Sequence, residues 1–415
     1  MIIIYYDKSL KTADENIFNF ILLRKNFYGN EIYGVDTFEK FKFILNLFHK
    51  TNQNFYLISS GSGTKEFMSS GYYEEYKNRI IDFLIFCFDK TSYLPLLKTT
   101  KVSMVENVNF QNIIEQIKTK EPQINEQEYI KHLSSFLLLD EYFDRPIEIH
   151  EKIAKFFDEN YTMPSFDESI KAKILDILNK IAKTKDDFEK AKGIIENIKN
   201  ETDIINCYTS ESIIVYFLNK CLREVDDKFI ELAGLMTYAL YKYYNDNPGI
   251  KINEDIVLYR KLTLSIKDLY AYDLFEKKII CFPSFTSTSK NIDAFDYPEV
   301  KKHKNSMYGT NSDKFICREK SVLIKISYKY KEGYECPCFS IKDISQFENE
   351  EEYVFPPFSF FRITNYCMNE GTKNDPVVIE LEVIPKCIYF EKNLKNGVKV
   401  FYDINNNCFK CELNM

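Results

Sequence analysis

The chain has 415 residues, a length that predicts two or three domains. Phe and Tyr number 35 and 30 while Gly and Pro number 12 each, so the composition excludes a disordered, collagen-like or low-complexity chain. The 62 acidic and 55 basic side chains leave a net charge of −7, which argues against a protein dedicated to duplex nucleic acid.

Residues 1–120 alternate between two hydrophobic patterns. Short apolar runs predict strands at 2–6, 31–35, 55–58, 80–88 and 101–105. Apolar residues at helical spacing predict intervening helices, with the clearest at 16–23, 38–48 and 110–117. Strands that alternate with helices predict a parallel sheet covered on both faces, as in a small flavodoxin-like or receiver-like α/β domain.

A polar segment at 118–128, which contains Pro122, marks the end of this first domain. Residues 121–245 that follow are mostly helical by pattern, because apolar residues recur three and four positions apart. The predicted helices are 129–139, 147–157, 169–182, 187–198, 211–224 and 227–244. We assign the last of these helices to the domain that follows them.

Residues 246–415 have a different composition, in which β-branched and aromatic residues form short runs between turn residues. The predicted strands are 256–259, 279–285, 322–328, 353–355, 358–363 and 377–383. Together with the helices before it, this β-rich part predicts an α+β domain.

A glycine-containing turn, Ser60–Lys65, follows a predicted strand and opens a helix. Backbone N–H groups at such a position can hold a phosphate, but the segment completes neither the P-loop nor the dinucleotide-binding pattern. We therefore favour a tight strand-to-helix turn. A receiver phosphorylation site is not expected, because the preceding strand ends in serines instead of a carboxylate, and we interpret this domain as regulatory or partner-binding.

Leader, membrane and metal signals are weak in this sequence. No apolar run reaches the roughly 18 residues of a membrane span, and the start of the chain lacks the basic residues of a secretory signal. The 11 cysteines are interpreted as reduced thiols, including the pairs Cys336/Cys338 and Cys408/Cys411, whose spacing does not favour zinc. We expect a cytoplasmic protein without a metal site and without a membrane partner.

An acidic run, Glu348–Glu352, directly precedes the predicted strand Tyr353–Phe355. Such a run is usually a solvated loop. If the strand begins at Glu352, however, alternation places Glu350 and Glu352 on one face, where two carboxylates can act on one small reacting group.

Two further groups precede the acids in the chain: Arg260 at the end of one strand, and the hydroxyl cluster Ser287–Ser289 after an aromatic strand. The order of arginine, Ser-Thr-Ser and Glu-x-Glu resembles the signature of the arginine-specific mono-ADP-ribosyltransferases. The segments 216–223, 344–347 and 355–363 also resemble that family, so the resemblance covers about residues 205–385.

The resemblance implies an ADP-ribosyltransferase fold, with a helical front and a two-sheet β core that binds NAD in residues 246–415. It implies transfer of ADP-ribose from NAD, as co-substrate, to an exposed arginine of a protein acceptor with release of nicotinamide. Two alternatives remain open: an NAD glycohydrolase with the same residues, and an inactive NAD-binding interaction module. A nucleic-acid acceptor is not excluded either.

The resemblance also implies a role for each site residue. Glu352 stabilises the positive charge that develops on the ribose, and Glu350 orients the acceptor guanidinium and takes its proton. Arg260 binds the pyrophosphate, and Ser287 holds Glu352 by a hydrogen bond. Phe347 recognises the acceptor. The resemblance also implies that four further residues bind NAD: Tyr259, Phe285, Thr288 and Phe295. For Arg260, Ser287 and the aromatic residues, the alternatives are a surface ion pair, a strand-end cap and core packing.

Two features depart from the family pattern. Lys261 stands where the family usually has a glycine after the arginine, and lysine tolerates positive φ poorly. The polar segment 297–320 is long, which is consistent with an insertion or a substrate loop.

Overall fold

The structure is a computed structural model of the whole chain. It describes residues 1–27, 30–87, 93, 102–106, 110–120, 136–143, 146–156, 168–210, 212–298, 319–345, 350–387, 390, 394, 399–403 and 407–412. The chain forms two compact units, each of which combines segments that are separate in sequence. The first unit comprises 1–134, 263–276 and 299–320, and the second comprises 135–262, 277–298 and 321–415.

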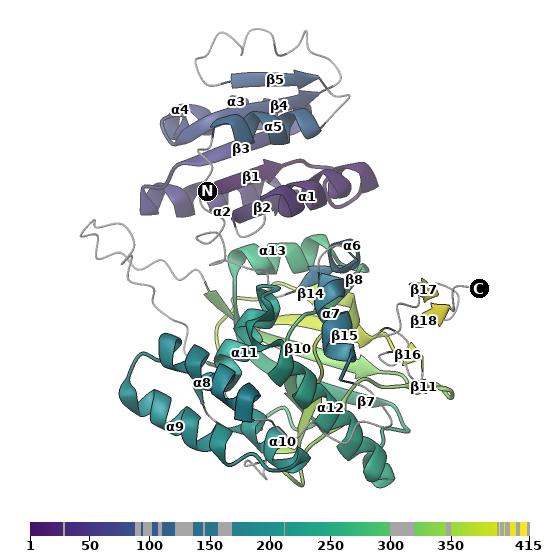
Figure 1. Cartoon of the computed structure of the whole chain (residues 1–415). Coiled ribbons are helices and arrows are strands. Elements are labelled where there is room, and N and C mark those ends of the chain that lie inside the picture. The colour runs from purple at the N-terminus through teal and green to yellow at the C-terminus, as the bar shows by residue number, and fades with distance from the viewer. Residues whose placement is uncertain are drawn as a thin grey trace. The chain divides into compact units, whose positions relative to one another are not determined.

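The first unit contains a five-stranded parallel sheet (Figure 1). Its strands are β1 (Ile2–Tyr6), β2 (Glu31–Val35), β3 (Phe55–Ser60), β4 (Ile80–Cys87) and β5 (Val102–Glu106). They pair in the order β2-β1-β3-β4-β5. This order is that of a doubly wound sheet, and it confirms the parallel sheet that the alternating pattern predicted.

Helices cover both faces of this sheet. They are α1 (Asp14–Asn26), α2 (Phe38–Thr51), α3 (Gly61–Ser69), α4 (Tyr72–Tyr76) and α5 (Gln111–Lys120). Neighbouring residues of a strand point to opposite faces, and Tyr5 and Tyr6 of β1 illustrate this. The Tyr5 ring lies 6.2 Å from Phe20 of α1, whereas the Tyr6 ring stacks on Phe41 of α2 at 4.5 Å.

The glycine-containing turn between β3 and α3 is a close-packed connection. Ser60 caps the helix by accepting a hydrogen bond from the Gly63 N–H at 3.4 Å. A Cβ atom at Gly63 would lie only 2.8 Å from the Ser59 hydroxyl and 2.9 Å from the Tyr6 ring. Close packing therefore accounts for a glycine at this position.

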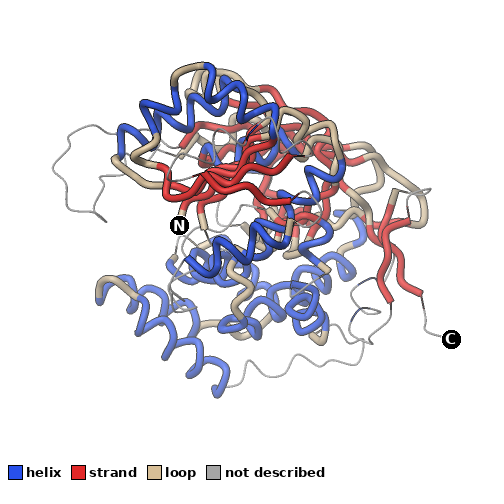
Figure 2. The backbone as a smooth tube through the Cα atoms, turned by 90° about the horizontal axis from the view of Figure 1, so that it is seen from above, coloured by secondary structure: helices blue, strands red, loops and turns tan. Residues whose placement is uncertain are grey.

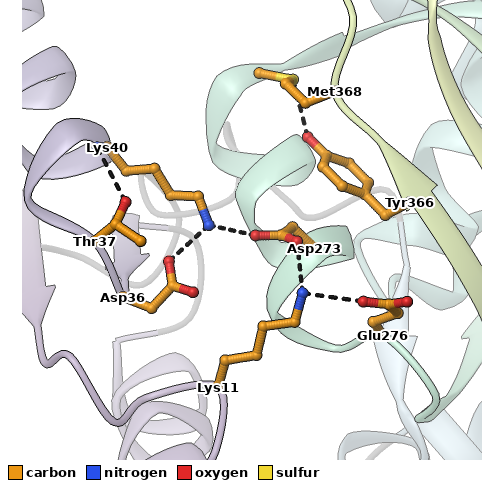
Figure 3. Close-up of polar contacts among 8 residues, drawn as sticks. All are labelled: Lys11, Asp36, Thr37, Lys40, Asp273, Glu276, Tyr366 and Met368. Carbon is orange, nitrogen blue, oxygen red and sulfur yellow. Dashed lines mark hydrogen bonds and ion pairs between the residues drawn. The ribbon is translucent and has the colours of Figure 1, made fainter.

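Helix α13 (Ile266–Leu274) also belongs to the first unit, although its sequence lies in the β-rich part of the chain. Ser265 caps it by accepting a hydrogen bond from the Asp268 N–H at 3.1 Å. Phe275, at its end, stacks on Phe20 with ring centroids 5.9 Å apart. Ion pairs also join Asp273 of α13 to Lys11, in the loop after β1, and to Lys40 of α2 (Figure 3). No helix was predicted here.

The second unit begins with helices, as the spacing predicted. They are α6 (Leu139–Tyr142), α7 (Pro146–Ala154), α8 (Glu168–Ile181), α9 (Lys185–Glu196), α10 (Glu201–Thr209), α11 (Ile213–Arg223), the 3-10 turn Asp227–Phe229 and α12 (Ile230–Asp246). Two differences stand out. Leu137–Leu138, near the end of the predicted helix 129–139, forms strand β6, and residues 129–135 of that prediction lie outside the described part of the chain. Helix α10 was not predicted.

The strands of the second unit pair into two sheets, and helices and strands can be followed in blue and red in Figure 2. A nine-stranded sheet has the order β12-β13-β9-β7-β10-β15-β14-β8-β6. Its other strands are β7 (Ile256–Ser265), β8 (Ile279–Phe282), β9 (Thr286–Ser289), β10 (Glu319–Tyr328), β12 (Phe339–Ser340), β13 (Glu352–Phe355), β14 (Ser359–Cys367) and β15 (Val377–Val383). The second sheet has four strands, β11 (Tyr334–Glu335), β16 (Lys386–Cys387), β18 (Cys408–Glu412) and β17 (Lys399–Asp403).

Aromatic contacts join the helices of the second unit to its large sheet. Tyr241 of α12 lies 4.6 Å from Phe339 of β12, measured between ring centroids. His150 of α7 stacks at 4.8 Å on Phe358, which directly precedes β14. The helical layer therefore packs on the sheet that carries the candidate site described below. None of the helices in the described part of the chain is long and apolar enough to span a membrane.

Candidate functional site

The candidate site forms where three strands of the second unit meet, and β9 is the strand between the other two. It pairs antiparallel with β13, with Ser287 opposite Val354 and Ser289 opposite Glu352. On its other side, Ser289 pairs with Tyr259 of β7. Alternation along the strands therefore places Ser287 and Glu352 on the same face of the sheet.

Arg260 of β7 is half-buried and faces the middle of β9. Its Nη1 atom donates a hydrogen bond to the backbone carbonyl of Ser287 at 2.7 Å. This bond uses one of the five donors of the guanidinium and fixes its direction. Burial raises the pKa of Glu352, and the charge of Arg260 is one of the effects that oppose this shift, so the predicted arginine, serine and glutamate lie close together.

Glu352 is the buried acid of the site, with only 5% of its surface exposed. Its Oε2 atom accepts a hydrogen bond from the hydroxyl of Ser345 at 3.0 Å. Burial raises the pKa of Glu352 above its ordinary value, and hydrogen bonds from Ser287 and Ser345 and the charge of Arg260 oppose that shift. Two hydroxyl donors thus hold the carboxylate, which retains lone pairs for a ligand hydroxyl.

Glu350 is half-buried and lies just before β13, not on it. Glu351 between the two acids has φ of +43°, so the strand alternation that we used to place Glu350 does not reach it. The link to β9 is made instead by Ser289, whose hydroxyl donates to the Glu350 carbonyl at 2.6 Å. The hydroxyl of Ser289 therefore anchors the backbone of Glu350.

The other predicted NAD-binding residues lie around this group in different environments. Thr288 is fully buried and donates to the carbonyl of Tyr353 at 3.0 Å, so it joins β9 to β13. Phe285 is 2% exposed and packs in the core. Tyr259 and Phe295 are half-buried, Tyr259 beside Ser289 and Phe295 in the loop after β9. Phe347 lies outside the described residues.

Lys261, the departure from the family pattern, contacts the loop that carries Phe295. Its Nζ atom lies 5.2 Å from the centroid of the Tyr297 ring and 3.9 Å from Asp293. These two residues flank Phe295 in sequence. A lysine at this position therefore connects β7 with the loop after β9.

Two residues that we did not assign to the site from sequence also belong to it. Tyr208, near the end of α10, has its hydroxyl 2.7 Å from the hydroxyl of Ser287. Arg223, at the end of α11, is half-buried, and burial together with the charge of Arg260 lowers its pKa. Arg223 had appeared only within the helix that resembles the family. No local pattern identified Tyr208.

The charges of the site suit a ligand with an anionic part and a polar sugar. Burial and the charge of Arg260 disfavour the ionised form of Arg223, and an anion bound by the two guanidinium groups would offset that cost. A pyrophosphate has suitable oxygens for two guanidinium groups. Glu352 beside them accepts hydrogen bonds but donates none when ionised, which suits a ribose hydroxyl. These residues fit NAD as a substrate.

No family model and no curated protein matches the sequence. The structure is similar to solved ADP-ribosyltransferases, at low identity. Vis in complex with the M6 inhibitor has a TM-score of 0.30 and 21% identity over 54% of this chain and 87% of Vis. Plx2a, a toxin from Paenibacillus larvae, has a TM-score of 0.30 and 17% identity over 52% of this chain and 96% of Plx2a. HopU1 of Pseudomonas syringae pv. Tomato DC3000 has a TM-score of 0.32 and 17% identity over 57% of this chain and 97% of HopU1. Similarity at this level assigns no activity, and the functional conclusion rests on the site residues.

Proposed function

We propose that this chain is a mono-ADP-ribosyltransferase that uses NAD as substrate and modifies arginine side chains of a protein acceptor. The observation that carries the proposal is the buried Glu352, held by the hydroxyls of Ser287 and Ser345 and accompanied by Arg260. The order of these groups along the chain, with the Glu-x-Glu spacing, supports the arginine-specific type.

The reaction requires little acid catalysis. Nicotinamide leaves NAD as a neutral group, and the bond that breaks leaves positive charge on the ribose. Glu352 accepts a hydrogen bond from the ribose 2′-hydroxyl, and this bond strengthens as the charge develops. Arg260 and Arg223 hold the pyrophosphate, so the ribose carbon is presented to the acceptor.

Glu350 serves the acceptor side of the proposed reaction. A guanidinium keeps its proton at neutral pH because its pKa is very high, so attack by its nitrogen requires a base that takes the proton. A carboxylate binds a guanidinium with two parallel hydrogen bonds, which orients the attacking nitrogen. The anchoring of the Glu350 backbone by Ser289 keeps this carboxylate in the segment beside Glu352.

The test measures nicotinamide release from NAD and transfer of label to agmatine or an arginine-rich protein. We expect Glu352→Gln to lose both activities, by a factor of about 10²–10³ or more. We expect Glu350→Gln to lose transfer while it keeps some hydrolysis. Glu351→Gln is the matched control, because it removes an exposed charge from the same run and is expected to keep both activities.

Full activity of Glu352→Gln would contradict the proposal. Nicotinamide release without any labelling of arginine would favour an NAD glycohydrolase with the same residues. No nicotinamide release by the wild-type protein, together with binding of NAD, would favour an inactive NAD-binding interaction module.

A further inference from the structure

We propose that Tyr208 is a positioning residue that directs the hydroxyl of Ser287 toward Glu352. Its catalytic consequence rests on the proposed function, whereas the hydrogen-bond arrangement itself does not. Tyr208 lies near the end of α10, a helix outside the predicted set, 79 residues before Ser287 in sequence. The two hydroxyl oxygens are 2.7 Å apart.

The direction of this hydrogen bond follows from its other partner. Glu352 lies on the same face of the sheet as Ser287, at the neighbouring pair of positions, and hydrogen bonding by Ser287 opposes the burial that raises the pKa of Glu352. An ionised carboxylate only accepts hydrogen bonds, so in this arrangement Ser287 is the donor. Ser287 has a single hydroxyl proton, and its oxygen must therefore accept from Tyr208. Burial, first of all, and the charge of Glu352 raise the pKa of Tyr208 to about 12, so the phenol keeps its proton at neutral pH.

The arrangement extends one step further, to Asn219 of α11. The Asn219 Oδ1 atom accepts a hydrogen bond from the backbone N–H of Phe285 at 3.1 Å. Its side chain also interacts with Tyr208, where it opposes the rise in the pKa of the phenol that burial and Glu352 cause. Since Oδ1 already accepts from Phe285, the amide group is available to donate to the phenol. The donors then run in one direction, from Asn219 through Tyr208 and Ser287 to Glu352, and each bond polarises the next.

Loss of the Tyr208 hydroxyl would leave the Ser287 oxygen without its donor and free the serine proton to turn away from Glu352. Ser345 would still donate to the carboxylate at 3.0 Å, so the effect should be partial. We expect Tyr208→Phe to lower kcat for NAD cleavage by about tenfold, as for other partners that orient a catalytic group. The ring of Tyr208, 5.4 Å from that of Phe285, is retained in this variant.

The experiment compares Tyr208→Phe, Ser287→Ala and the double variant in the full chain. Tyr328→Phe is the control, because it removes another buried phenol of the same unit outside this chain of hydrogen bonds. Two properties are measured: the midpoint of urea unfolding, which requires no activity, and nicotinamide release as a function of pH. If Tyr208 acts through Ser287, adding Tyr208→Phe to Ser287→Ala will change kcat less than twofold, far below the single effect.

The pH dependence separates positioning from a loss of packing. Weaker donation to Glu352 raises its pKa, so Tyr208→Phe should move the acid limb of the kcat profile to higher pH. A packing role alone would lower the unfolding midpoint without moving that limb. Additive changes in the unfolding midpoint, or an unmoved acid limb in an active variant, would overturn the inference. Non-additive midpoints in a protein that never cleaves NAD would support the hydrogen-bond chain and reject the proposed function.

Discussion

Lys11, in the loop after β1, lies 2.8 Å from Asp273 of α13, which follows it by 262 residues in sequence. Lys40 forms a second ion pair with Asp273, and Lys11 also reaches Glu276 at 3.0 Å (Figure 3). Burial opposes ionisation of Asp273, but hydrogen bonds and charges from Lys11 and Lys40 outweigh it and hold the pKa of this carboxyl below its ordinary value. Helix α13 begins directly after β7, the strand of Arg260, and belongs to the first unit.

We expect Asp273→Asn to lower the free energy of unfolding by about 1–3 kcal/mol at pH 7, because two half-buried ammonium groups lose the carboxylate that they share. Lys11 keeps its ion pair with Glu276, and Lys40 keeps its ion pair with Asp36. The pKa of Asp273 is lowered in the folded chain. Its contribution is therefore present above the ordinary pKa of an aspartate and is lost as the pH falls through the folded value. Urea unfolding across pH checks both effects, and the two proteins should converge in acid.

The control for this substitution is Asp176→Asn, which breaks an exposed ion pair with Lys180 on α8. Exposed pairs contribute little, so the change should stay within about 0.5 kcal/mol. Equal losses for both substitutions would show that the contact with α13 has no special stability.

Substitution of Gly34 tests the packing around α13, and Gly193 of α9 provides a comparison without close packing. A Cβ atom at Gly34 of β2 would lie 2.9 Å from the Phe20 ring and 3.1 Å from Leu274 of α13. Gly34→Ala should therefore cost about 1–3 kcal/mol of unfolding free energy. Gly193 lies inside α9 with nothing within 4 Å of its added Cβ, so Gly193→Ala should gain about 0.5–1 kcal/mol. Thermal and urea unfolding show whether each variant is less or more stable than the wild-type protein. A lower unfolding free energy for Gly193→Ala would contradict the prediction for that glycine.

The elements that were predicted well are those with a strong local pattern. Ile2–Tyr6 and Glu31–Val35 have the predicted bounds, because an apolar run between polar residues identifies a buried strand. Helix α13 lacked such a signal. It has nine residues, follows a strand without a break, and depends on packing against β2 from more than 200 residues away. Short helices fixed by distant contacts cannot be identified from local spacing.

The residues of the candidate site also differ in how well they could be predicted from the sequence. Arg260, Ser287 and Glu352 could be identified because each lies next to a short apolar run and their order along the chain is informative. The strand ends were predicted less well, since Arg260 and Ser287 lie inside β7 and β9 and only Glu352 begins its strand. Tyr208 could not, because its role depends on one hydrogen bond to a residue 79 positions later. Glu350 was identified by spacing, but the alternation invoked for it fails at Glu351, where φ is positive.

The pH dependence of NAD cleavage should report on Glu352. Burial raises the pKa of this carboxyl, so nicotinamide release should rise with pH through a value above that of an ordinary glutamate. Ser345→Ala removes one of the opposing hydrogen bonds, which should move this limb to higher pH and lower kcat about tenfold. Ser359→Ala is the control, because that buried hydroxyl donates to the carbonyl of Pro356. It should leave the limb in place.

The same shift has a consequence for stability. A raised pKa in the folded chain means that ionised Glu352 is favoured by the unfolded chain. The wild-type protein should therefore lose stability relative to Glu352→Gln as the pH rises from the ordinary glutamate range through the folded pKa. Unfolding free energies of the two proteins at pH 4 and pH 7 test this sign, and a wild-type advantage that grows with pH would contradict it.

The last prediction separates the two buried hydroxyls next to Ser287. Ser289 donates to the carbonyl of Glu350 and accepts a hydrogen bond from the N–H of Asn291 at 2.9 Å, whereas Thr288 donates to Tyr353. Each substitution, Ser289→Ala and Thr288→Val, should cost about 1 kcal/mol of unfolding free energy. Only Ser289→Ala frees the backbone of Glu350, so it alone should lower arginine transfer relative to NAD hydrolysis, by about tenfold. The ratio of labelled agmatine to released nicotinamide measures this partition, and an unchanged ratio in Ser289→Ala would show that Ser289 supports the strand without positioning Glu350.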